Sequence, residues 1–490
     1  MTEKRPPVVA VPDLLSVARP RVADGSLSGF LRQLDAIAGC TRPIRLVGAV
    51  DQADRATGEL RRAFDSATLP DGTLLVPCGN RRASVCPSCS YLYAGDAWQI
   101  VHAGLLGGQN VPASVAGHPG LFVTLTAPSF GPVHSQRAAH GRAQRCQRYS
   151  EGRCRHGRPR CGRVHADDDP LLGQAVCRDC FDYPAAVLWN AVASRLWKRT
   201  VDLAYRRIAT LAGLTEKRLR GQLRISYVKV AEMQARGLIH FHGILRLDAF
   251  TAWPGVFEPP PAWANVDLLT AAWRWAVQHA RESSPHPRRS DRPRPYGEDT
   301  PATYARWGEQ AKADPVAVEG GQMTPGMVAG YLAKYVTKST TDGGALDRRI
   351  RTLDELHGVL PFLNPHQAAL VRTAWELGGW PDLAPHRLRQ NAHAFGYRGH
   401  WLTKSRRYST TFAACRTVRR TWRATHRPDG SERTPLDAWG RALDEDQVVI
   451  HAAWRFQGTG YRHPGDHELA TLAADQARSR REAARTRAAA

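Results

Sequence analysis

Runs of apolar residues with two different periods divide the chain into elements. Residues 222–231 and 238–247 alternate apolar and polar positions on either side of a turn that carries Gly237, which predicts a β-hairpin. The short apolar run at residues 121–126 is rich in β-formers and predicts a buried strand. Apolar positions at helical spacing predict helices at residues 91–107, 184–214, 264–281 and 325–338. The pattern as a whole predicts an α+β fold.

The same pattern, together with changes in composition, divides the chain into five expected segments. They are a flexible N-terminal arm (1–30), an N-terminal region with a first cysteine cluster (31–120), an α+β domain with a cysteine-rich insertion at 146–180 (121–340), a basic region of helices and aromatic residues (341–430), and a C-terminal helix with a disordered tail (431–490). Two Pro-rich stretches, at 251–262 and 283–302, are expected to be surface insertions.

The charge of the chain indicates a polyanionic partner. Lys and Arg number 68 against 45 acidic residues, a formal net charge of +23. This excess favours nucleic acid, because basic side chains neutralise phosphates and release counterions. The N-terminus has no signal-peptide core and no apolar run is long enough to span a bilayer, so we expect a cytoplasmic protein without a membrane partner. In that reducing compartment, ten cysteines point to metal sites rather than disulfides.

Two histidines lie two residues apart in the second strand of the predicted hairpin. His240 and His242 therefore project from one face, while Phe241 points to a core on the other face. Two imidazoles on a rigid strand form half of a divalent-metal site, which a carboxylate or amide must complete. Glu232 on the partner strand is the first candidate, and Gln234 near the turn is the second. The alternative is a pair of strand histidines with local hydrogen bonds.

Two tyrosines share one face of the helix predicted at 325–338. Tyr331 and Tyr335 are four residues apart, and each is followed three residues later by a lysine, Lys334 or Lys338. A phenol with its ordinary pKa of about 10 is a poor nucleophile. A metal that polarises a phosphate, and an ammonium that stabilises negative charge, make its attack on a DNA phosphodiester feasible. The alternative is a core helix that buries two tyrosines beside solvated lysines.

Three stretches, in this order, resemble the HUH-endonuclease superfamily, and in particular the rolling-circle replication initiators of actinobacterial plasmids. They are Phe122-Val-Thr-Leu-Thr126, Ile239-His-Phe-His242 and Tyr331-Leu-Ala-Lys-Tyr-Val-Thr-Lys338. The resemblance extends from about residue 40 to residue 412. It implies an HUH nuclease domain, with a central antiparallel sheet flanked by helices, and the tyrosine helix packed against the histidine strand.

The resemblance also implies an activity. Relatives nick and rejoin single-stranded DNA at a plasmid origin through a 5′-phosphotyrosine, with Mg²⁺ or Mn²⁺, and so start rolling-circle replication. In relatives with one nucleophile the tyrosine corresponds to Tyr335, and in relatives with two both Tyr331 and Tyr335 are active; we favour Tyr335 first. The sequence has no Gly-rich P-loop, so a host helicase is expected to unwind the duplex. The free 3′-hydroxyl left by the nick can prime a DNA polymerase, which is the second expected partner.

The cysteines predict structural zinc. Cys86 and Cys89, and Cys177 and Cys180, form two C-x-x-C pairs, which are typical of zinc sites. The preferred partition has two sites, one with Cys154, Cys161, Cys177 and Cys180, and one with Cys78, Cys86, Cys89 and either Cys146 or a histidine. A single site that joins the two pairs is the alternative, and His156 and His165 are further possible ligands. Cys40 and Cys415 are isolated and are expected to be structural. We expect these sites to brace a DNA-binding insertion.

A basic segment near the C-terminus is a candidate DNA contact. Residues 393–408 interleave cations with aromatic residues, as single-strand binders do, because cations bind phosphates while rings stack on bases. The candidate residues are Arg398, Lys404, Arg406 and Arg407, and residues 416–427 extend the same basic stretch. The alternative is a surface loop with a few core aromatics.

Two other functions are compatible with parts of the pattern. A conjugative relaxase or a single-strand transposase would use the same chemistry, but relaxases commonly have a third histidine and a tyrosine near the N-terminus, which this sequence does not show. A non-enzymatic zinc-braced DNA-binding regulator would explain the charge and the cysteines. It would not explain why the sequence has both a His-x-His strand and a helix with two tyrosines.

Overall fold

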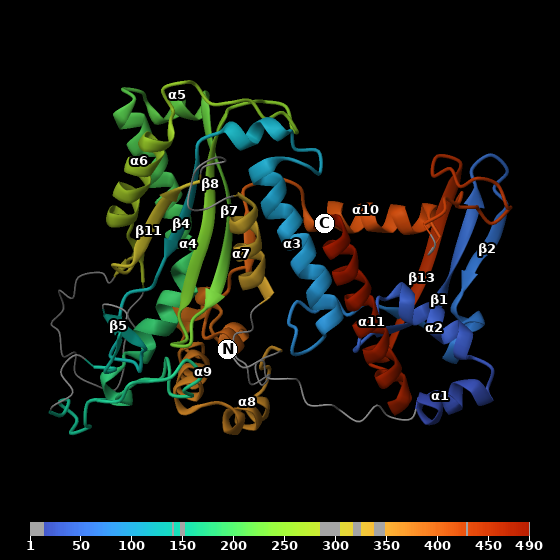
Figure 1. Cartoon of the computed structure of the whole chain (residues 1–490), viewed down its shortest axis with the longest axis horizontal. Coiled ribbons are helices and arrows are strands. Elements are labelled where there is room, and N and C mark those ends of the chain that lie inside the picture. The colour runs from blue at the N-terminus through green and yellow to red at the C-terminus, as the bar shows by residue number, and fades with distance from the viewer. Residues whose placement is uncertain are drawn as a thin grey trace. The chain divides into compact units, whose positions relative to one another are not determined.

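The computed structural model describes residues 14–139, 142–147, 152–284, 304–316, 325–337, 348–427 and 430–489. They form two compact units (Figure 1): unit 1 is drawn from residues before 97 and after 411, and unit 2 from residues 97–411. The boundary after residue 96 falls within helix α3 (Pro87–Leu106). The units differ from the five segments expected from the sequence, because both ends of the chain contribute to unit 1.

A five-stranded antiparallel sheet forms the centre of unit 2, in the order β11-β4-β8-β7-β12. The strands are β4 (Gly120–Leu125), β7 (Leu223–Met233), β8 (Ile239–Ala249), β11 (Ala311–Pro315) and β12 (Leu402–Lys404). The predicted buried strand is β4, and the predicted hairpin is β7 and β8. The structure thus confirms both elements and the α+β class.

Helices lie on both faces of this sheet. Helices α4 (Tyr183–Leu211) and α6 (Val266–His279) lie on one face, and α7 (Pro325–Thr337) lies on the other (Figure 1). On β8 the odd-numbered side chains point toward α4, where the ring of Phe241 lies 5.8 Å from that of Trp197. The even-numbered side chains point toward α7, where the ring of His242 lies 5.1 Å from that of Tyr331. These helices, and α3, lie where the apolar spacing predicted them.

Shorter elements complete unit 2. They are the helices α5 (Glu216–Arg220), α8 (Leu353–Val359) and α9 (Pro365–Leu377), the hairpins β5 (Arg137–Ala139) with β6 (Arg142–Gln144) and β9 (Glu282–Ser283) with β10 (Tyr304–Ala305), and 3-10 turns at Ala113–Gly117, Arg178–Cys180, Leu360–Phe362, Pro381–His386 and Arg389–Ala394. The Pro-rich stretch at 251–262 forms a mostly exposed loop, and the one at 283–302 lies from residue 285 on outside the described residues. Within the described ranges, no helix has the length and the apolar composition needed to cross a membrane.

Unit 1 contains a second antiparallel sheet, in the order β13-β1-β2, with β3 also paired to β1. Its elements are α1 (Leu14–Ala23), α2 (Leu27–Ala36), β1 (Ile44–Asp54), β2 (Leu60–Asp65), β3 (Leu74–Val76), α10 (Phe412–Thr425), β13 (Val448–Thr459) and α11 (Pro464–Ala489), with 3-10 turns at Ser66–Thr68 and Pro70–Gly72. The central strand β1 therefore has neighbours from both ends of the chain.

Two expectations for the chain ends differ from the structure. Residues 14–23 and 27–36 are helical, although residues 1–30 were expected to be a flexible arm; residues 1–13 lie outside the described part. The segment 431–490 contains strand β13 as well as the expected helix, which is α11. The strand escapes sequence analysis because residues 451–457 are exposed on both faces, so they carry no contrast between a core side and a solvent side.

A buried arginine joins the two ends of unit 1. Arg21, on α1, is 2% exposed and forms ion pairs of 2.6 Å with Asp71 and of 2.7 Å with Asp466, at the start of α11. Two guanidinium nitrogens donate to each carboxylate, which is the geometry that makes such pairs strong. The contact links a helix near the N-terminus to the last helix of the chain.

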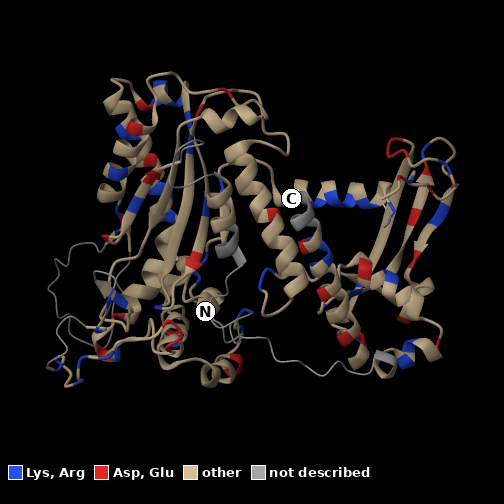
Figure 2. Ribbon diagram, in the orientation of Figure 1, with Lys and Arg blue, Asp and Glu red and all other residues tan. Residues whose placement is uncertain are grey.

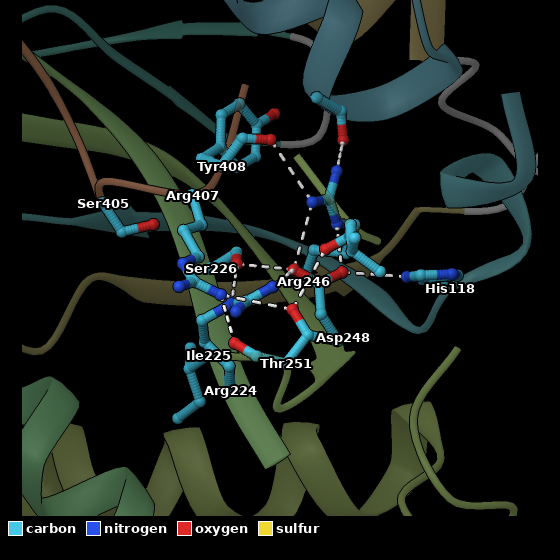
Figure 3. A network of polar contacts seen from close by, with 12 residues as sticks. His118, Arg224, Ile225, Ser226, Arg246, Asp248, Thr251, Ser405, Arg407 and Tyr408 are labelled. Atoms are coloured by element: carbon cyan, nitrogen blue, oxygen red, sulfur yellow. Dashed lines mark hydrogen bonds and ion pairs between the residues drawn. The ribbon is translucent and has the colours of Figure 1, made fainter. Parts of the chain in front are cut away.

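A buried polar network holds the end of the β7–β8 hairpin that lies away from the turn (Figure 3). The carboxylate of Asp248, which is fully buried, lies 2.8 Å from Nδ1 of His118 and accepts hydrogen bonds of 2.5 Å from Ser226 and 2.7 Å from Arg246. Burial by itself raises the pKa of Asp248, but the hydrogen bond with His118 and the charge of Arg246 outweigh it and hold the pKa below its usual value. The network therefore keeps a buried carboxylate ionised.

The opposite face of the hairpin buries a lysine. Lys229 is 4% exposed, and its ammonium lies 3.9 Å from the ring centre of Phe241 and 5.5 Å from that of Trp197. Burial lowers its pKa to about 7. The aromatic rings offer the charged form a cation–π contact, which only partly replaces its hydration.

Replacement of Asp248 by Asn should destabilise unit 2. The change leaves Arg246 buried without its carboxylate, and breaking a buried pair in this way costs about 3–5 kcal/mol. Urea unfolding followed by circular dichroism measures the loss. The exposed Asp314→Asn variant is the control, with an expected change within about 0.5 kcal/mol; equal stability of the two variants would contradict the role assigned to the network.

Replacement of Lys229 by Met should stabilise the protein at neutral and acidic pH. Lys229 has a pKa of about 7 in the fold and about 10.4 when unfolded, so folding releases its proton between these values. The resulting cost is fully present below pH 7 and disappears as the pH rises toward 10. We expect the variant to gain on the order of 2–4 kcal/mol at pH 6, and less at pH 9.5. Unfolding curves at both pH values test this, and a variant less stable than the parent at pH 6 contradicts it.

Candidate functional site

The structure brings the three predicted ligands of the catalytic metal together on the face of the sheet that α7 covers. Glu232 on β7 is directly opposite His240 on β8. His242 is two residues further along β8, so its side chain points to the same side of the sheet. The imidazole ring centres of His240 and His242 are 4.4 Å apart. Nε2 of His242 lies 3.5 Å from a carboxylate oxygen of Glu232. The register of the hairpin therefore gathers two imidazoles and one carboxylate.

Strand β4 adds two residues to this site, Phe122 and Thr124, to which the sequence analysis assigned no role. Thr124 is paired with His242 across the sheet, and its hydroxyl oxygen lies 3.2 Å from Nδ1 of that imidazole. The ring of Phe122 is nearly parallel to that of His242, with ring centres 6.1 Å apart. A hydrogen bond at Nδ1 fixes the orientation of the imidazole and leaves Nε2 to face Glu232. Both residues lie in the first of the three stretches that carry the family resemblance, and they are two apart on the predicted strand, so they share one face.

The described part of the tyrosine helix lies over these histidines. The ring of Tyr331 is nearly perpendicular to those of His242 and Phe122, with centres 5.1 Å and 5.9 Å away. Tyr331 is 40% exposed, whereas Val328 and Leu332 on the same helix are fully buried. The helix is thus anchored by its apolar side, and its first tyrosine stands between the imidazoles and solvent.

Three further residues predicted for catalysis are placed only in part. Tyr335 and Lys334 belong to α7, but the structure describes only their backbone. Lys338 lies outside the described residues altogether. Four residues correspond to about one turn of an α-helix, so the backbone places Tyr335 one turn beyond Tyr331 on the same face.

The group of side chains has the chemistry of a divalent-cation site. Imidazole nitrogens and a carboxylate oxygen suit cations that accept mixed ligands. His240 and His242 are 8% and 4% exposed, whereas the side chain of Glu232 is 15% exposed. Three protein ligands would leave further coordination positions of a cation free for water or a phosphate.

The four residues predicted to contact DNA have two different environments. Arg398 and Arg406 are exposed. Arg407 instead donates hydrogen bonds of 2.8 Å and 3.3 Å to carbonyl oxygens of residues 252–253, and so holds the loop after β8. The ammonium of Lys404 donates to two nearby carbonyl oxygens, and burial lowers its pKa. Arg398 also donates a hydrogen bond of 2.8 Å to the carbonyl oxygen of Pro385, so Arg406 is the best placed of the four for a phosphate contact.

The basic stretch at 416–427 belongs to unit 1 rather than to the sheet that carries the histidines. Most of it forms helix α10, along which Figure 2 colours several positions blue, the colour of Lys and Arg. Arg419 is paired with Asp96, and Arg423 donates a hydrogen bond of 3.0 Å to the carbonyl of Ala36. Arg416 and Arg420 are exposed. Part of this stretch therefore fastens the helix to unit 1.

Four cysteine sulfurs gather in unit 1. Cys40, Cys78, Cys86 and Cys89 have their sulfur atoms within 4.8 Å of one another. The sulfurs of Cys40 and Cys86 are 3.8 Å apart, and the backbone N–H of Cys78 donates to the sulfur of Cys40 over 3.3 Å. This corrects the expectation that Cys40 is isolated, because it takes the fourth position that was given to Cys146 or a histidine. Its separation of 38 residues from Cys78 hid the relation in the sequence.

The cysteines of unit 2 also divide differently from the preferred partition. One group is His134, Cys146, Cys161 and His165, and the other is Cys154, His156, Cys177 and Cys180, each with its ligand atoms within 4.8 Å of one another. The expected set is thus wrong in one member, since Cys161 lies with Cys146. A single site that joins both C-x-x-C pairs is also excluded, because the pairs belong to different groups. All three groups could hold a structural metal such as zinc.

Comparison with known proteins gives the family. The model of a family described as "Replication initiator protein, pSAM2" matches residues 26–475. A replication initiator protein of Streptomyces ambofaciens is 41% identical over 452 residues, which cover 90% of this chain and 89% of that protein. No solved structure matches. The chain therefore belongs to the family of replication initiator proteins represented by that of pSAM2.

Proposed function

We propose that the protein starts rolling-circle replication of a plasmid by nicking one strand of the origin DNA with a tyrosine of α7. One observation carries the proposal: the ring of Tyr331 lies 5.1 Å from that of His242, whose Nε2 lies 3.5 Å from the carboxylate of Glu232. A tyrosine, two histidines and a carboxylate from elements far apart in the sequence are thus neighbours, which supports the proposed roles of nucleophile and cation ligands. The membership of the replication initiator family supports origin DNA as the partner.

The chemistry is a transesterification. A phenol oxygen of Tyr331 or Tyr335 loses its proton and attacks the phosphorus of a DNA phosphodiester. A new bond forms between that oxygen and phosphorus, and the bond to the 3′-oxygen breaks, which takes up a proton and leaves as a free 3′-hydroxyl. The 5′-phosphotyrosine conserves the bond energy, so the reverse attack by a 3′-hydroxyl rejoins the strand. We assign charge stabilisation to Lys334 and Lys338.

The metal in this proposal is Mg²⁺ or Mn²⁺, held by His240, His242 and Glu232. When bound, it would polarise the phosphate and stabilise the charge that develops on it. Thr124 keeps the imidazole of His242 in the orientation that presents Nε2 to the site. The partners that follow from a nick with a free 3′-hydroxyl are a DNA polymerase, which extends it, and a host helicase, which unwinds the duplex.

A covalent complex with DNA is the expected product. Incubation with Mg²⁺ and single-stranded origin oligonucleotides should attach a 3′-terminal label to the protein, and should release a 5′-labelled fragment that a polymerase can extend. The Tyr331→Phe/Tyr335→Phe variant should lose the adduct to background, because no phenol remains on the helix face. Each single variant then identifies the nucleophile, with Tyr335→Phe expected to cause the larger loss.

The matched control is Tyr304→Phe, since Tyr304 is an exposed tyrosine on β10, and it should form the adduct normally. An adduct that persists in the double variant rejects the tyrosine mechanism. A parent protein that binds the origin oligonucleotides tightly but never forms an adduct indicates a non-enzymatic DNA-binding regulator instead.

Removal of the hydroxyl of Thr124 should weaken the metal site without abolishing the fold. Loss of a group that orients a ligand costs about 10–100-fold in metal affinity or activity, so Thr124→Val should shift the Mn²⁺ concentration needed for half-maximal adduct formation upward by that factor. Thr124→Ser retains the hydroxyl and should restore the parent value. If Val and Ser behave alike, Thr124 acts only through packing.

A further inference from the structure

The insertion between β4 and α4 carries its metal ligands in an alternating order. The first group takes His134 and Cys146, and later Cys161 and His165; the second group takes Cys154 and His156, and later Cys177 and Cys180. Along the chain, the ligand pairs therefore come in the order first group, second group, first group, second group. When the four ligands of either group bind one ion, the chain between them forms a loop. That loop contains two ligands of the other group.

The first group has the geometry of a four-coordinate site. Nδ1 of His134 lies 3.2 Å from Nε2 of His165 and 3.9 Å from the sulfur of Cys146, and the sulfur of Cys161 lies 3.4 Å from the same Nε2. Ligand atoms about 2.0–2.3 Å from a tetrahedral zinc are about 3.3–3.8 Å from one another. The three distances in this group are close to that range. The other nitrogen of His165 lies 2.7 Å from Asp169, the carboxylate contact that typically orients a zinc-bound histidine.

The second group is similar and shares its scaffold with the first. Nδ1 of His156 lies 3.2 Å from the sulfur of Cys180 and 3.8 Å from that of Cys177. The backbone of His134, a ligand of the first group, forms two hydrogen bonds of 2.8 Å with residues 173–174, just before Cys177. The backbone N–H of Cys146 donates to Arg163 over 2.8 Å. The backbone of the first group is thus tied both to the segment just before Cys177 and to the segment between its own later ligands, Cys161 and His165.

We propose that residues 133–180 form a cross-braced module that binds two zinc ions, one at a Cys2His2 site and one at a Cys3His site, and that the two sites fold together. Zinc at the first site fixes the ends of the segment that carries Cys154 and His156. Zinc at the second fixes the ends of the segment that carries Cys161 and His165. Each ion therefore reduces the loop entropy that the other must overcome, so binding is cooperative.

The module also carries the charge needed to hold DNA. Residues 136–165 contain nine arginines and one glutamate, and Figure 2 colours several positions of the ribbon around β5 and β6 blue, the colour of Lys and Arg. Arg155, Arg158 and Arg160 are exposed. Arg236, in the turn between β7 and β8, donates hydrogen bonds of 2.9 Å and 3.1 Å to carbonyl oxygens of residues 127–128, at the start of the insertion. The module is thus fixed at the turn that lies beside Glu232 and His240. Its role in gripping the substrate strand rests on the proposed function; its zinc chemistry does not.

Metal analysis of the full chain tests the cross-brace. After dialysis against metal-free buffer, the parent should retain about three zinc ions, one for each group. Cys177→Ser should lose two of them, although it removes a ligand from one site, and Cys161→Ser should do the same. Cys86→Ser should lose the ion of unit 1 alone. The control Cys415→Ser changes a buried cysteine outside the three groups and should retain all three.

Two results would overturn the proposal. One is a parent protein with a single zinc ion that Cys86→Ser removes, which would leave the insertion without metal. The other is a pair of variants, Cys161→Ser and Cys177→Ser, that each keep two ions, which would make the sites independent. A second measurement avoids variants that fail to fold. A thiol-alkylating reagent added stepwise to the parent should release the two zinc ions of the insertion together in one cooperative phase, apart from the single ion of unit 1. Release of the three ions in three one-ion phases contradicts coupling.

The DNA contact is tested separately from strand cleavage. Binding of single-stranded origin DNA by Arg155→Gln/Arg158→Gln/Arg160→Gln should depend less on salt, because each lost phosphate contact lowers the slope of log affinity against log salt by about 0.7. A slope smaller by about 2 is therefore expected. Adduct formation should recover at saturating DNA, since the tyrosine helix is intact. An unchanged slope rejects the role of these arginines.

A charge-matched control excludes a general effect of net charge. Lys198, Arg199 and Arg372 are exposed cations on α4 and α9, and their replacement by Gln should leave the slope within error of the parent. The two proposals are tested by different measurements. Loss of cleavage in the tyrosine variants tests the nicking role of α7, whereas the zinc content and the salt dependence of binding test the role of the insertion. Failure of the nicking proposal would thus leave the zinc result standing.

Discussion

The pairing of β7 with β8 is the constraint on which the candidate site depends. Glu232 faces the imidazoles because it is opposite His240, and a slip of one residue would turn the carboxylate to the core side of the sheet. The pairing is held by contacts away from the site: Phe241 packs against Trp197 on one face, and Asp248 fixes the far end of the hairpin. Groups with no part in the proposed chemistry thus determine its geometry.

The sequence predicts what depends on neighbouring residues. The alternation around His240 and His242, and the helical spacing around Tyr331, are local patterns, so the hairpin, the helix and their main ligands could be inferred. Long-range relations could not: Cys40 joins a group whose other members lie 38 residues and more away, and β13 pairs with a strand formed some 400 residues earlier. The contact of Thr124 with His242 is also a long-range relation, because only the pairing of β4 with β8 brings the two residues together.

The two kinds of candidate metal site differ in ligand softness, which suits them to different ions. Thiolates with imidazoles select zinc, whereas imidazoles with a carboxylate accept harder ions. The sulfur ligands of unit 2 all lie between β4 and α4, and the sheet face below α7 presents nitrogen and oxygen. In the proposed scheme this separation lets one protein hold permanent zinc while its reacting centre exchanges Mg²⁺ or Mn²⁺ freely.

The composition of unit 1 from both chain ends bears on how the protein is made. Strand β1 emerges from the ribosome some 400 residues before its partner β13, and Arg21 likewise precedes Asp466, which binds it. Unit 2 is continuous and can fold while the chain grows. A product that ends before β13 would carry the histidine and tyrosine elements with an unfinished first unit. Unit 1 thus closes only after all of unit 2 has been synthesised.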